Sequence, residues 1–484
     1  MPGRRRGELA RVARRAGCLG DAALPALIFG VTLVLRTWEI DRRFWLLGDQ
    51  IRDWEIALRP FADLPLVGPP THVGGYTIGP AFYWILWTVR VTLGPWFDNL
   101  PHAGGIGQAA ILSAADALLF VAVRRRAGST WIALAAVTLL ATAAFDLCLA
   151  AMVWNPVVGS ALARIATALV LLDWHRADAA RAAATLAIAW AAVHAYTGAV
   201  FVAVGVFLAA LFDPFVRGDR ATARRNAIAA LIVVSLLQLP YVAHRLVHPR
   251  VGPAMGAVTG SLWRVATGRD APQVEKSVRG YVEAVAFVQG APWRPRGLGW
   301  APALGGILLA VRRRRDAALL SVTLVPQALA VAGYALFLDD LDHYYYLSLM
   351  PSAVLTILLA ALPAGRSRLA TTFAAATFAA ALLPVPARVR AAATMHQWPE
   401  YGALLDGSRR AARLEQPLRA LTTEFPLPPT TDGTFLYRIL GGRLDPRSPW
   451  TATIGRDGRV TYRRVEPMPD PLPAGGSRGP RSDR

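Results

Sequence analysis

The sequence predicts an all-α polytopic membrane protein with about eleven transmembrane helices and a small α+β domain at its C-terminal end. Of its 484 residues 54% are hydrophobic, which is too apolar for an ordinary soluble enzyme of this length. Apolar runs of membrane length recur along the chain, and short arginine runs separate them. The last hundred or so residues instead carry Pro/Gly turns and short alternating runs, which are typical of a small soluble domain.

The formal net charge of +20 reports membrane topology and predicts no nucleic-acid partner. In a soluble chain such a charge would suggest nucleic acid. Here the arginines lie between apolar segments, where they mark the cytoplasmic loops of a membrane protein. The two cysteines, Cys18 and Cys148, are too few for a metal cluster, and we expect no disulfide between them.

Residues 1–21 form a basic segment that we expect to remain cytoplasmic, ahead of an uncleaved first span at 22–38. This orientation places residues 39–102 in the first outer loop. Within that loop, the apolar stretch 80–96 is shorter than the roughly 20 residues that a span needs, and it carries Arg90 in its middle. We therefore expect it to lie in the membrane interface.

The later spans follow from the arginine runs, each of which should lie on the inner side. The stretch 182–212 is too long for one helix, so we expect two spans that turn near 194–198. A polar outer loop of about fifty residues follows residue 246. The other spans are expected at 103–123, 130–150, 156–173, 226–246, 298–311, 317–337, 345–363 and 369–384.

The domain organisation follows from these spans. Residues 22–384 form the transmembrane domain, and residues 385–468 form a soluble domain on the outer side. Residues 469–484 are rich in Pro, Gly, Ser and Arg, which is typical of a disordered tail.

The first candidate site is a cluster of charge just after the first span. On a helix that starts near Asp49, the side chains of Asp49, Arg52 and Asp53 share one face, opposite an apolar face. Charged groups beside lipid are costly to desolvate, which favours a functional role. The alternative is that Asp49 is a helix N-cap and that the acidic face is merely solvated.

Two further patterns lie on the same outer side. Trp154-Asn155-Pro156 begins a span, where Asn155 is either functional or a helix cap. The Gly/Pro-rich stretch 64–80 has backbone amides that either approach a ligand or belong to a structured loop.

The order and spacing of these three patterns resemble the bacterial membrane glycosyltransferases of the GT-C fold. Those enzymes include protein O-mannosyltransferases, lipid A aminoarabinose transferases and lipopolysaccharide-core galacturonosyltransferases. Gly48-Asp49-Gln50 matches the acidic motif after span one, and Trp154-Asn155-Pro156 matches the motif at a later outward helix start. Residues 69–84 match the Pro-rich loop with its Tyr-Trp segment more loosely. Gln50 and Asn155 depart from the family, which commonly has acids at both positions.

The resemblance implies transfer of a sugar from a polyprenyl-phosphate donor to a lipid, glycan or protein acceptor. The reaction would take place at the outer face of a bacterial cytoplasmic membrane, in contact with membrane lipid. Asp49 is the expected base for the acceptor hydroxyl, because a partly desolvated carboxylate is a stronger base than one in water. A single direct displacement would invert the anomeric carbon. The pattern requires no cofactor and names no metal ligand, although it allows a divalent metal.

The remaining candidate substrate-binding residues are spread along the outer side. Arg52, Arg245, Lys276 and His343 lie on the outer side, where each is either a ligand of the donor phosphate or a solvated loop residue. The resemblance places His194 and Tyr196 on the same cavity, and the alternative is that they belong to a hairpin turn that satisfies its own polar groups. The aromatic run 342–346 is either an interfacial belt or a surface for sugar stacking. The substrate-binding candidates are thus Arg52, Asp53, Gln50, Asn155, His194, Tyr196, Lys276 and His343.

Two other functions fit many spans without catalysis. A transporter or flippase of lipid-linked sugars usually has its polar site at the membrane midplane and repeat symmetry, whereas charge here concentrates in outer loops. A non-catalytic envelope assembly protein would fit if Asp49 were only a helix cap.

Overall fold

The computed structural model is mostly helical and divides into two compact units, Met1–Gln397 and Trp398–Arg484. Each unit is described by itself. The structure describes residues 22–40, 44–71, 75–150, 152–248, 255–290, 299–337, 341–361, 368–394, 398, 400–414, 416–428 and 431–466. The predicted basic N-terminal segment 1–21 and the predicted tail 469–484 lie outside these residues.

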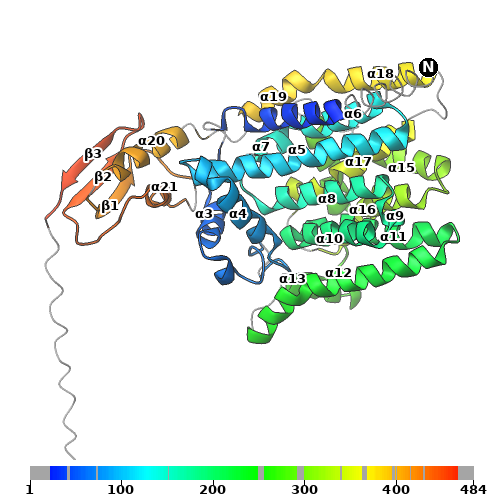
Figure 1. Ribbon diagram of the computed structural model, residues 1–484, viewed down its shortest axis with the longest axis horizontal. Helices are drawn as coiled ribbons and strands as arrows, with labels where there is room; N and C mark the ends of the chain where they lie inside the picture. Colours follow the sequence, from blue (N-terminus) through cyan, green and yellow to red (C-terminus); the bar gives the residue numbers. More distant parts are fainter. Residues whose placement is uncertain are drawn as a thin grey trace, which may run out of the picture. The chain divides into compact units, whose positions relative to one another are not determined.

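The first unit is a bundle of helices whose axes run roughly side by side (Figure 1). After the helix Ala22–Thr37 it contains α3 (Gly48–Ala57), η1 (Phe61–Asp63), α4 (Ala81–Thr92), η2 (Gly94–Trp96), α5 (Leu100–Ala127), α6 (Thr130–Ala141), α7 (Ala144–Ala150) and α8 (Asn155–Leu171). The chain continues through α9 (Trp174–Ala177), α10 (Ala179–Ala195), η3 (Thr197–Ala199), α11 (Val200–Val216), α12 (Arg220–Val247), α13 (Met255–Ala266) and α14 (Val274–Gly290). It ends with α15 (Ala301–Arg312), α16 (Ala317–Ala335), η5 (His343–Leu349), α17 (Met350–Ala361), α18 (Arg368–Leu382) and α19 (Val385–Thr394).

The bundle is built to cross a membrane. Among the described residues, six helices are long and apolar enough to span a bilayer, and five shorter apolar helices fall on other predicted spans. The 12-residue α4 falls on the stretch 80–96, which was predicted to lie in the interface. The protein is therefore a multi-pass membrane protein, as its sequence predicts.

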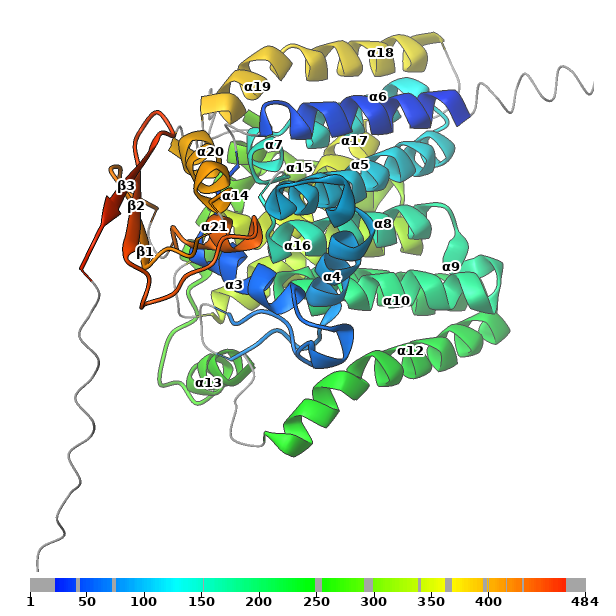
Figure 2. The same ribbon diagram turned by 60° about the vertical axis from the view of Figure 1, so that its left-hand side comes forward.

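The interior and the periphery of the bundle differ clearly. Helix α8 packs against α5, α10 and α11, and almost all of its residues are buried. Helices α12 and α18 lie on opposite sides of the bundle in both views (Figure 2). Helix α12 exposes large apolar side chains to its surroundings, which suits contact with lipid. They include Ile228, Leu231, Ile232, Leu236 and Leu239.

The apolar stretches 182–212 and 130–150 each contain two helices, but only the first was predicted to do so. The stretch 182–212 is the expected pair of helices, α10 and α11, with its turn at Tyr196 and η3. The prediction of one continuous helix over 130–150 was wrong, because the chain breaks at Thr142 and Ala143 between α6 and α7. The break lets α7 turn the Asp146 carboxylate toward two buried arginines, which are described below.

The described part of the predicted fifty-residue polar loop contains helices that the sequence analysis does not predict. It contains α13 and α14, and α14 packs against α16, η5 and α7. Tyr281, Ala284 and Val285 on α14 belong to the main hydrophobic core. The polar residues on the opposite side of α14 lower the average hydropathy of the segment, and this hid an amphipathic helix from a search for apolar runs.

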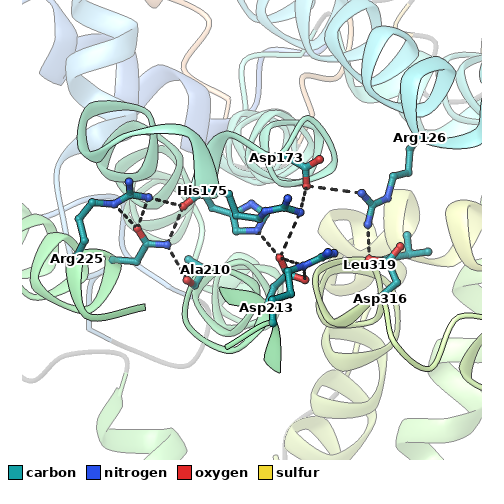
Figure 3. Close-up of polar contacts among 11 residues, drawn as sticks. Arg126, Asp173, His175, Ala210, Asp213, Arg225, Asp316 and Leu319 are labelled. Atoms are coloured by element: carbon teal, nitrogen blue, oxygen red, sulfur yellow. Dashed lines mark hydrogen bonds and ion pairs between the residues drawn. The ribbon is translucent and has the colours of Figure 1, made fainter. Parts of the chain in front are cut away.

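One end of the bundle carries the arginine runs, and we call it the inner end. There Arg126, in the last turn of α5, pairs with Asp173, after α8, and with Asp316, before α16 (Figure 3). Asp213 of α11 accepts a hydrogen bond from Arg217 at 3.1 Å and lies 3.4 Å from His175 of α9. These contacts put the ends of α5, α8 and α11 beside the starts of α12 and α16, as the arginine pattern predicts.

The second unit is a small α+β domain, as the sequence predicts. It contains α20 (Glu400–Ala412), α21 (Phe435–Ile439) and the strands β1 (Ala420–Thr423), β2 (Trp450–Ile454) and β3 (Val460–Arg464). β2 is central, parallel to β1 and antiparallel to β3. α20 packs on β2, where Gly407 leaves room for the Ile454 side chain. The unit begins at Trp398, whereas the predicted boundary lies before residue 385.

Candidate active site at the outer helix ends

Helix α3 begins one residue before Asp49. Leu47 occupies the N-cap position, and its backbone N–H donates to Gln50 Oε1 at 2.7 Å. Asp49 therefore lies in the first turn and does not cap the helix, so the capping interpretation was wrong. The buried Gln50 fastens the start of α3 through this hydrogen bond.

Arg52 holds two carboxylates in very different surroundings. Its Nη1 lies 2.7 Å from Asp49 Oδ1, and its Nη2 lies 2.9 Å from Asp53 Oδ1. The Asp49 side chain is 62% exposed, whereas that of Asp53 is 1% exposed. The three side chains are neighbours, as predicted, but of the two carboxylates only that of Asp49 is accessible to a substrate.

The desolvated carboxylate of this helix is Asp53. Burial raises the pKa of Asp53 to about 6, although Arg52 and the Tyr83 hydroxyl both favour its ionised form. The Tyr83 hydroxyl donates to Asp53 Oδ1 at 3.1 Å, and burial raises the pKa of Tyr83 above its usual range. The expectation that Asp49 is the partly desolvated acid was therefore wrong.

Helix α3 is fixed to the bundle from two sides. Arg90 of α4 donates to the Leu58 carbonyl at the C-terminal end of α3, at 2.9 Å. Trp54 is fully buried against α5, where a Cβ on Gly104 would lie 2.2 Å from the indole ring. A rigid α3 gives the Asp49 carboxylate a defined position.

The start of α8 is tied to two other helices, α5 and α10. Gln108 of α5 donates to the carbonyls of Ala150 and Met152 and accepts the backbone N–H of Trp154 at 2.9 Å. Asn155 does not cap α8. Its amide donates instead to the Ala195 carbonyl at the end of α10, at 3.0 Å. Asn155 thus joins the two outer helix ends.

The aromatic run in η5 meets both helix starts. The Trp154 and Tyr344 rings are 4.7 Å apart between centroids, and Tyr344 stacks on Tyr345 at 4.6 Å. The carboxylates of Asp49 and Asp342 both interact electrostatically with the Tyr344 hydroxyl. Asp49 and Trp154 therefore lie in one region, which we call the outer site.

Tyr196, in the turn between α10 and α11, lies behind the outer site. Its side chain is buried, and its hydroxyl has no hydrogen-bond partner among the described residues. That hydroxyl is in electrostatic range of Tyr344, Tyr345 and Asp342. The structure thus brings Tyr196 close to the region of Asp49, although it is buried there.

His194 has a different position from the one expected. It is buried beneath the Gly/Pro-rich stretch, where a Cβ on Gly79 would lie 2.0 Å from His194 Nδ1. Within that stretch, the Gly68 N–H donates to the Thr77 carbonyl, and the Thr77 N–H donates to the Pro69 carbonyl. These amides are occupied by the loop itself, which favours the interpretation of a structured loop.

Lys276 and His343 are two of the other candidate phosphate ligands. Lys276 lies in the first turn of α14, half-buried and next to Ser277, whose carbonyl accepts the Tyr346 hydroxyl at 3.1 Å. This contact brings the start of α14 to η5. The side chain of His343 lies outside the described residues.

Sequence reasoning missed a buried cluster of four charges in the bundle. Arg36 Nη2 lies 2.6 Å from Asp116 and 2.7 Å from Asp146. Arg164 pairs with the same two carboxylates, and all four side chains are buried. Each of these residues is a single charge near or within an apolar run, and that is the signal that could have found them.

No metal site is evident in the described part of the chain. No group of three or more His, Cys, Asp or Glu side chains there is arranged to hold a metal ion. At the outer site a cation already lies between the two acids, because Arg52 binds both Asp49 and Asp53.

Comparison with known proteins gives a fold and no sequence family. No family model matches the chain, and neither does any curated protein sequence. Among solved structures, the chain is similar to ArnT from Cupriavidus metallidurans bound to undecaprenyl phosphate, with a TM-score of 0.52 and 14% identity. The match covers 89% of this chain and 85% of that one.

Two other solved structures match over a similar part of this chain. They are the apo state of the same ArnT (TM-score 0.48, 15% identity, covering 89% of this chain and 86% of that one) and the Archaeoglobus fulgidus oligosaccharyltransferase tethered with an acceptor peptide (0.47, 12%, 88% and 63%). The ArnT match with undecaprenyl phosphate carries the assignment. The chain has the GT-C fold of membrane glycosyltransferases, as its motifs predict.

Proposed function

We propose that this protein is a membrane glycosyltransferase that moves a sugar from a polyprenyl-phosphate donor to a lipid, glycan or protein acceptor. The observation that carries the proposal is the exposed Asp49 carboxylate, which Arg52 fixes at the outer site of a GT-C fold. An ArnT with this fold was solved with undecaprenyl phosphate bound. We place the reaction at the outer face of a bacterial cytoplasmic membrane.

Asp49 is the proposed base because it is the carboxylate that an acceptor can reach. Asp53 is enclosed by Arg52 and Tyr83. An exposed carboxylate is a weak base in water, so we expect bound donor and acceptor to displace water from Asp49 and raise its basicity. The ion pair with Arg52 orients the carboxylate before the substrates arrive.

In the proposed step the acceptor oxygen forms a bond to the anomeric carbon of the sugar. Asp49 takes the proton of the acceptor hydroxyl as this bond forms. The bond between the anomeric carbon and the phosphate oxygen breaks, and its electron pair leaves with the polyprenyl phosphate. A single displacement of this kind inverts the anomeric carbon.

The leaving phosphate needs cations, and the isoprenoid needs an apolar surface. Arg52 is the proposed phosphate ligand nearest to Asp49, and Lys276 and His343 are the other candidates for this role. Gln50 and Asn155 support the site by holding α3 and the start of α8. The exposed apolar face of α12 suits contact with the isoprenoid chain as well as with bulk lipid.

The test compares wild type with Asp49→Asn in lipid nanodiscs. Undecaprenyl phosphates bearing different sugars serve as donors, and an envelope lipid and glycan extract serves as the acceptor. We expect Asp49→Asn to lower the transfer rate by about 100-fold or more, the usual contribution of a general base. Asp63→Asn, which changes another exposed acid of the same loop, should leave the rate unchanged.

Two outcomes would contradict the proposal. Undiminished transfer by Asp49→Asn would remove Asp49 from the mechanism. A wild-type protein that binds lipid-linked sugars but transfers none to any acceptor would favour a transporter or an assembly protein instead. Mass spectrometry of envelope glycolipids from cells with and without the protein would then identify the sugar, if transfer occurs.

A further inference from the structure

The outer site contains an aromatic surface that has no role in the proposed reaction step. Trp154, Tyr344 and Tyr345 are in ring contact, and each is only half-buried, so part of each ring faces outward. Two explanations compete for such rings in a membrane protein. They are an interfacial belt that faces lipid, or a surface that binds a ligand.

The burial of α8 and of the span that starts at Tyr344 argues against a lipid-facing belt. A residue of such a belt has a largely exposed side chain, and that of Trp96 is 81% exposed. Trp154 instead occupies the N-cap position of α8, a helix that is buried on nearly all sides. The candidate span that starts at Tyr344 is 78% buried, the highest share among the six. The outward parts of these rings therefore open at the end of the bundle and not at its lipid-facing side.

The Trp154 ring is held by its contact with Tyr344 and by the hydrogen bonds of the backbone that carries it. Gln108 binds its backbone N–H and the carbonyls just before it. The next residue, Asn155, is bound to the end of α10. A ring that is held in place before binding loses little conformational freedom when a ligand covers it, which suits recognition of a flat apolar sugar face.

The charges around the rings restrict the kind of sugar. Asp49 and Asp342 both act on the Tyr344 hydroxyl. The cation that contacts Asp49, Arg52, is also bound to Asp53. An acidic sugar stacked on Tyr344 would place a third negative charge beside Asp49 and Asp342, whereas a neutral or cationic sugar would not.

We propose that Trp154, Tyr344 and Tyr345 form the surface on which the transferred sugar of the donor stacks, and that the sugar is neutral or cationic and not a uronic acid. This inference rests on the proposed function, because it names the substrate class of the same site. It adds Trp154 and Asp342 as specificity-determining residues.

The test measures how tightly the protein in nanodiscs binds three lipids. They are undecaprenyl phosphate alone and the same lipid bearing glucose or glucuronic acid. For Trp154→Ala we expect about five- to tenfold weaker binding of the glucose-bearing lipid, the usual loss for one aromatic contact. Binding of undecaprenyl phosphate alone should change less than about twofold, because it has no sugar to stack. Trp154→Phe should keep most of the affinity, and Trp96→Ala should match wild type.

The charge argument has its own measurement. Wild type should bind the glucuronic acid lipid more weakly than the glucose lipid, and Asp342→Asn should narrow that difference. Equal binding of the glucose lipid by Trp154→Ala and wild type, or a wild-type preference for the glucuronic acid lipid, would overturn the inference while leaving sugar transfer intact. Wild type that binds none of the three lipids would instead contradict the proposed function and, with it, this inference.

Discussion

At the scale of single residues, α3 shows how one turn of helix gives two aspartates different chemistry. Asp49 and Asp53 are four residues apart and share Arg52 as a partner. Tyr83 and the bundle cover only Asp53. The sequence placed all three charged residues on one face, but it could not show which carboxylate α4 would cover, because that depends on a contact across thirty residues.

The raised pKa of Asp53 makes stability depend on pH. The pKa of this carboxyl is about 6 in the folded protein and about 3.9 in an unfolded chain, so the folded state binds more protons between these values. The contribution of Asp53 to the free energy of unfolding is therefore fully present below a pH of about 4, and it is lost as the pH rises through about 6. The shift corresponds to about 3 kcal/mol. Thermal unfolding in nanodiscs from pH 4 to 8 measures it.

Two variants make this prediction specific. Asp53→Asn should remove the fall in stability over that window, because an amide does not titrate. Tyr83→Phe should move the fall to higher pH, since the Tyr83 hydroxyl donates to the ionised carboxylate. An unchanged pH profile in Asp53→Asn would show that another group causes the fall.

At the scale of elements, local patterns predicted those helices that coincide with an apolar run flanked by polar residues. The turn at 194–198 followed from the length of the apolar stretch and the arginines on both sides, and it lies at Tyr196 and η3 as expected. The break between α6 and α7 and the buried side of α14 depend on partners far away in the chain, such as Arg36 and α16. No pattern within those segments reveals such partners.

The contact between the Gly/Pro-rich stretch and α10 gives a second prediction. Gly79→Ala places a Cβ 2.0 Å from the His194 ring, which is enclosed and cannot move away easily. We expect a loss of stability of about 1–3 kcal/mol, the usual cost of overpacking. Gly30→Ala is the control, because nothing lies within 4 Å of that position and alanine favours a helix.

A double variant separates this contact from a general effect of the loop. Gly79→Ala should cost less stability in a protein that already carries His194→Ala than it costs in wild type. Simple addition of the two losses would mean that the loop and α10 do not press on each other at this point.

At the scale of the whole molecule, two polar clusters tie together helices that sequence analysis treats as separate spans. The inner-end contacts of Arg126 join α5 to α16 and to the end of α8, and that of Asp213 with His175 joins α11 to α9 (Figure 3). The four buried charges join Ala22–Thr37, α5, α7 and α8 nearer the outer site. The arginine pattern predicted the shared inner end. Pairing between single charges in different spans requires the three-dimensional packing.

The four-charge cluster is balanced, so removing one member should cost far more than removing an opposite pair. Asp116→Asn leaves Arg36 and Arg164 to share one carboxylate, and we expect a loss of about 3–5 kcal/mol. Glu283→Gln, which breaks the exposed pair with Arg279, should cost less than about 1 kcal/mol. Thermal unfolding and the yield of folded protein measure both losses.

The decisive comparison is between Asp116→Asn and the double variant Asp116→Leu with Arg164→Met. The double variant removes one charge of each sign and leaves Arg36 with Asp146, which lie 2.7 Å apart. It should therefore be more stable than Asp116→Asn, because no buried cation is left without a full partner. If the double variant were the less stable of the two, the cluster would hold the helices by its specific geometry and not by charge balance. In that case sugar transfer should fall with it, since Asp146 lies on the helix that leads to Trp154 and the outer site.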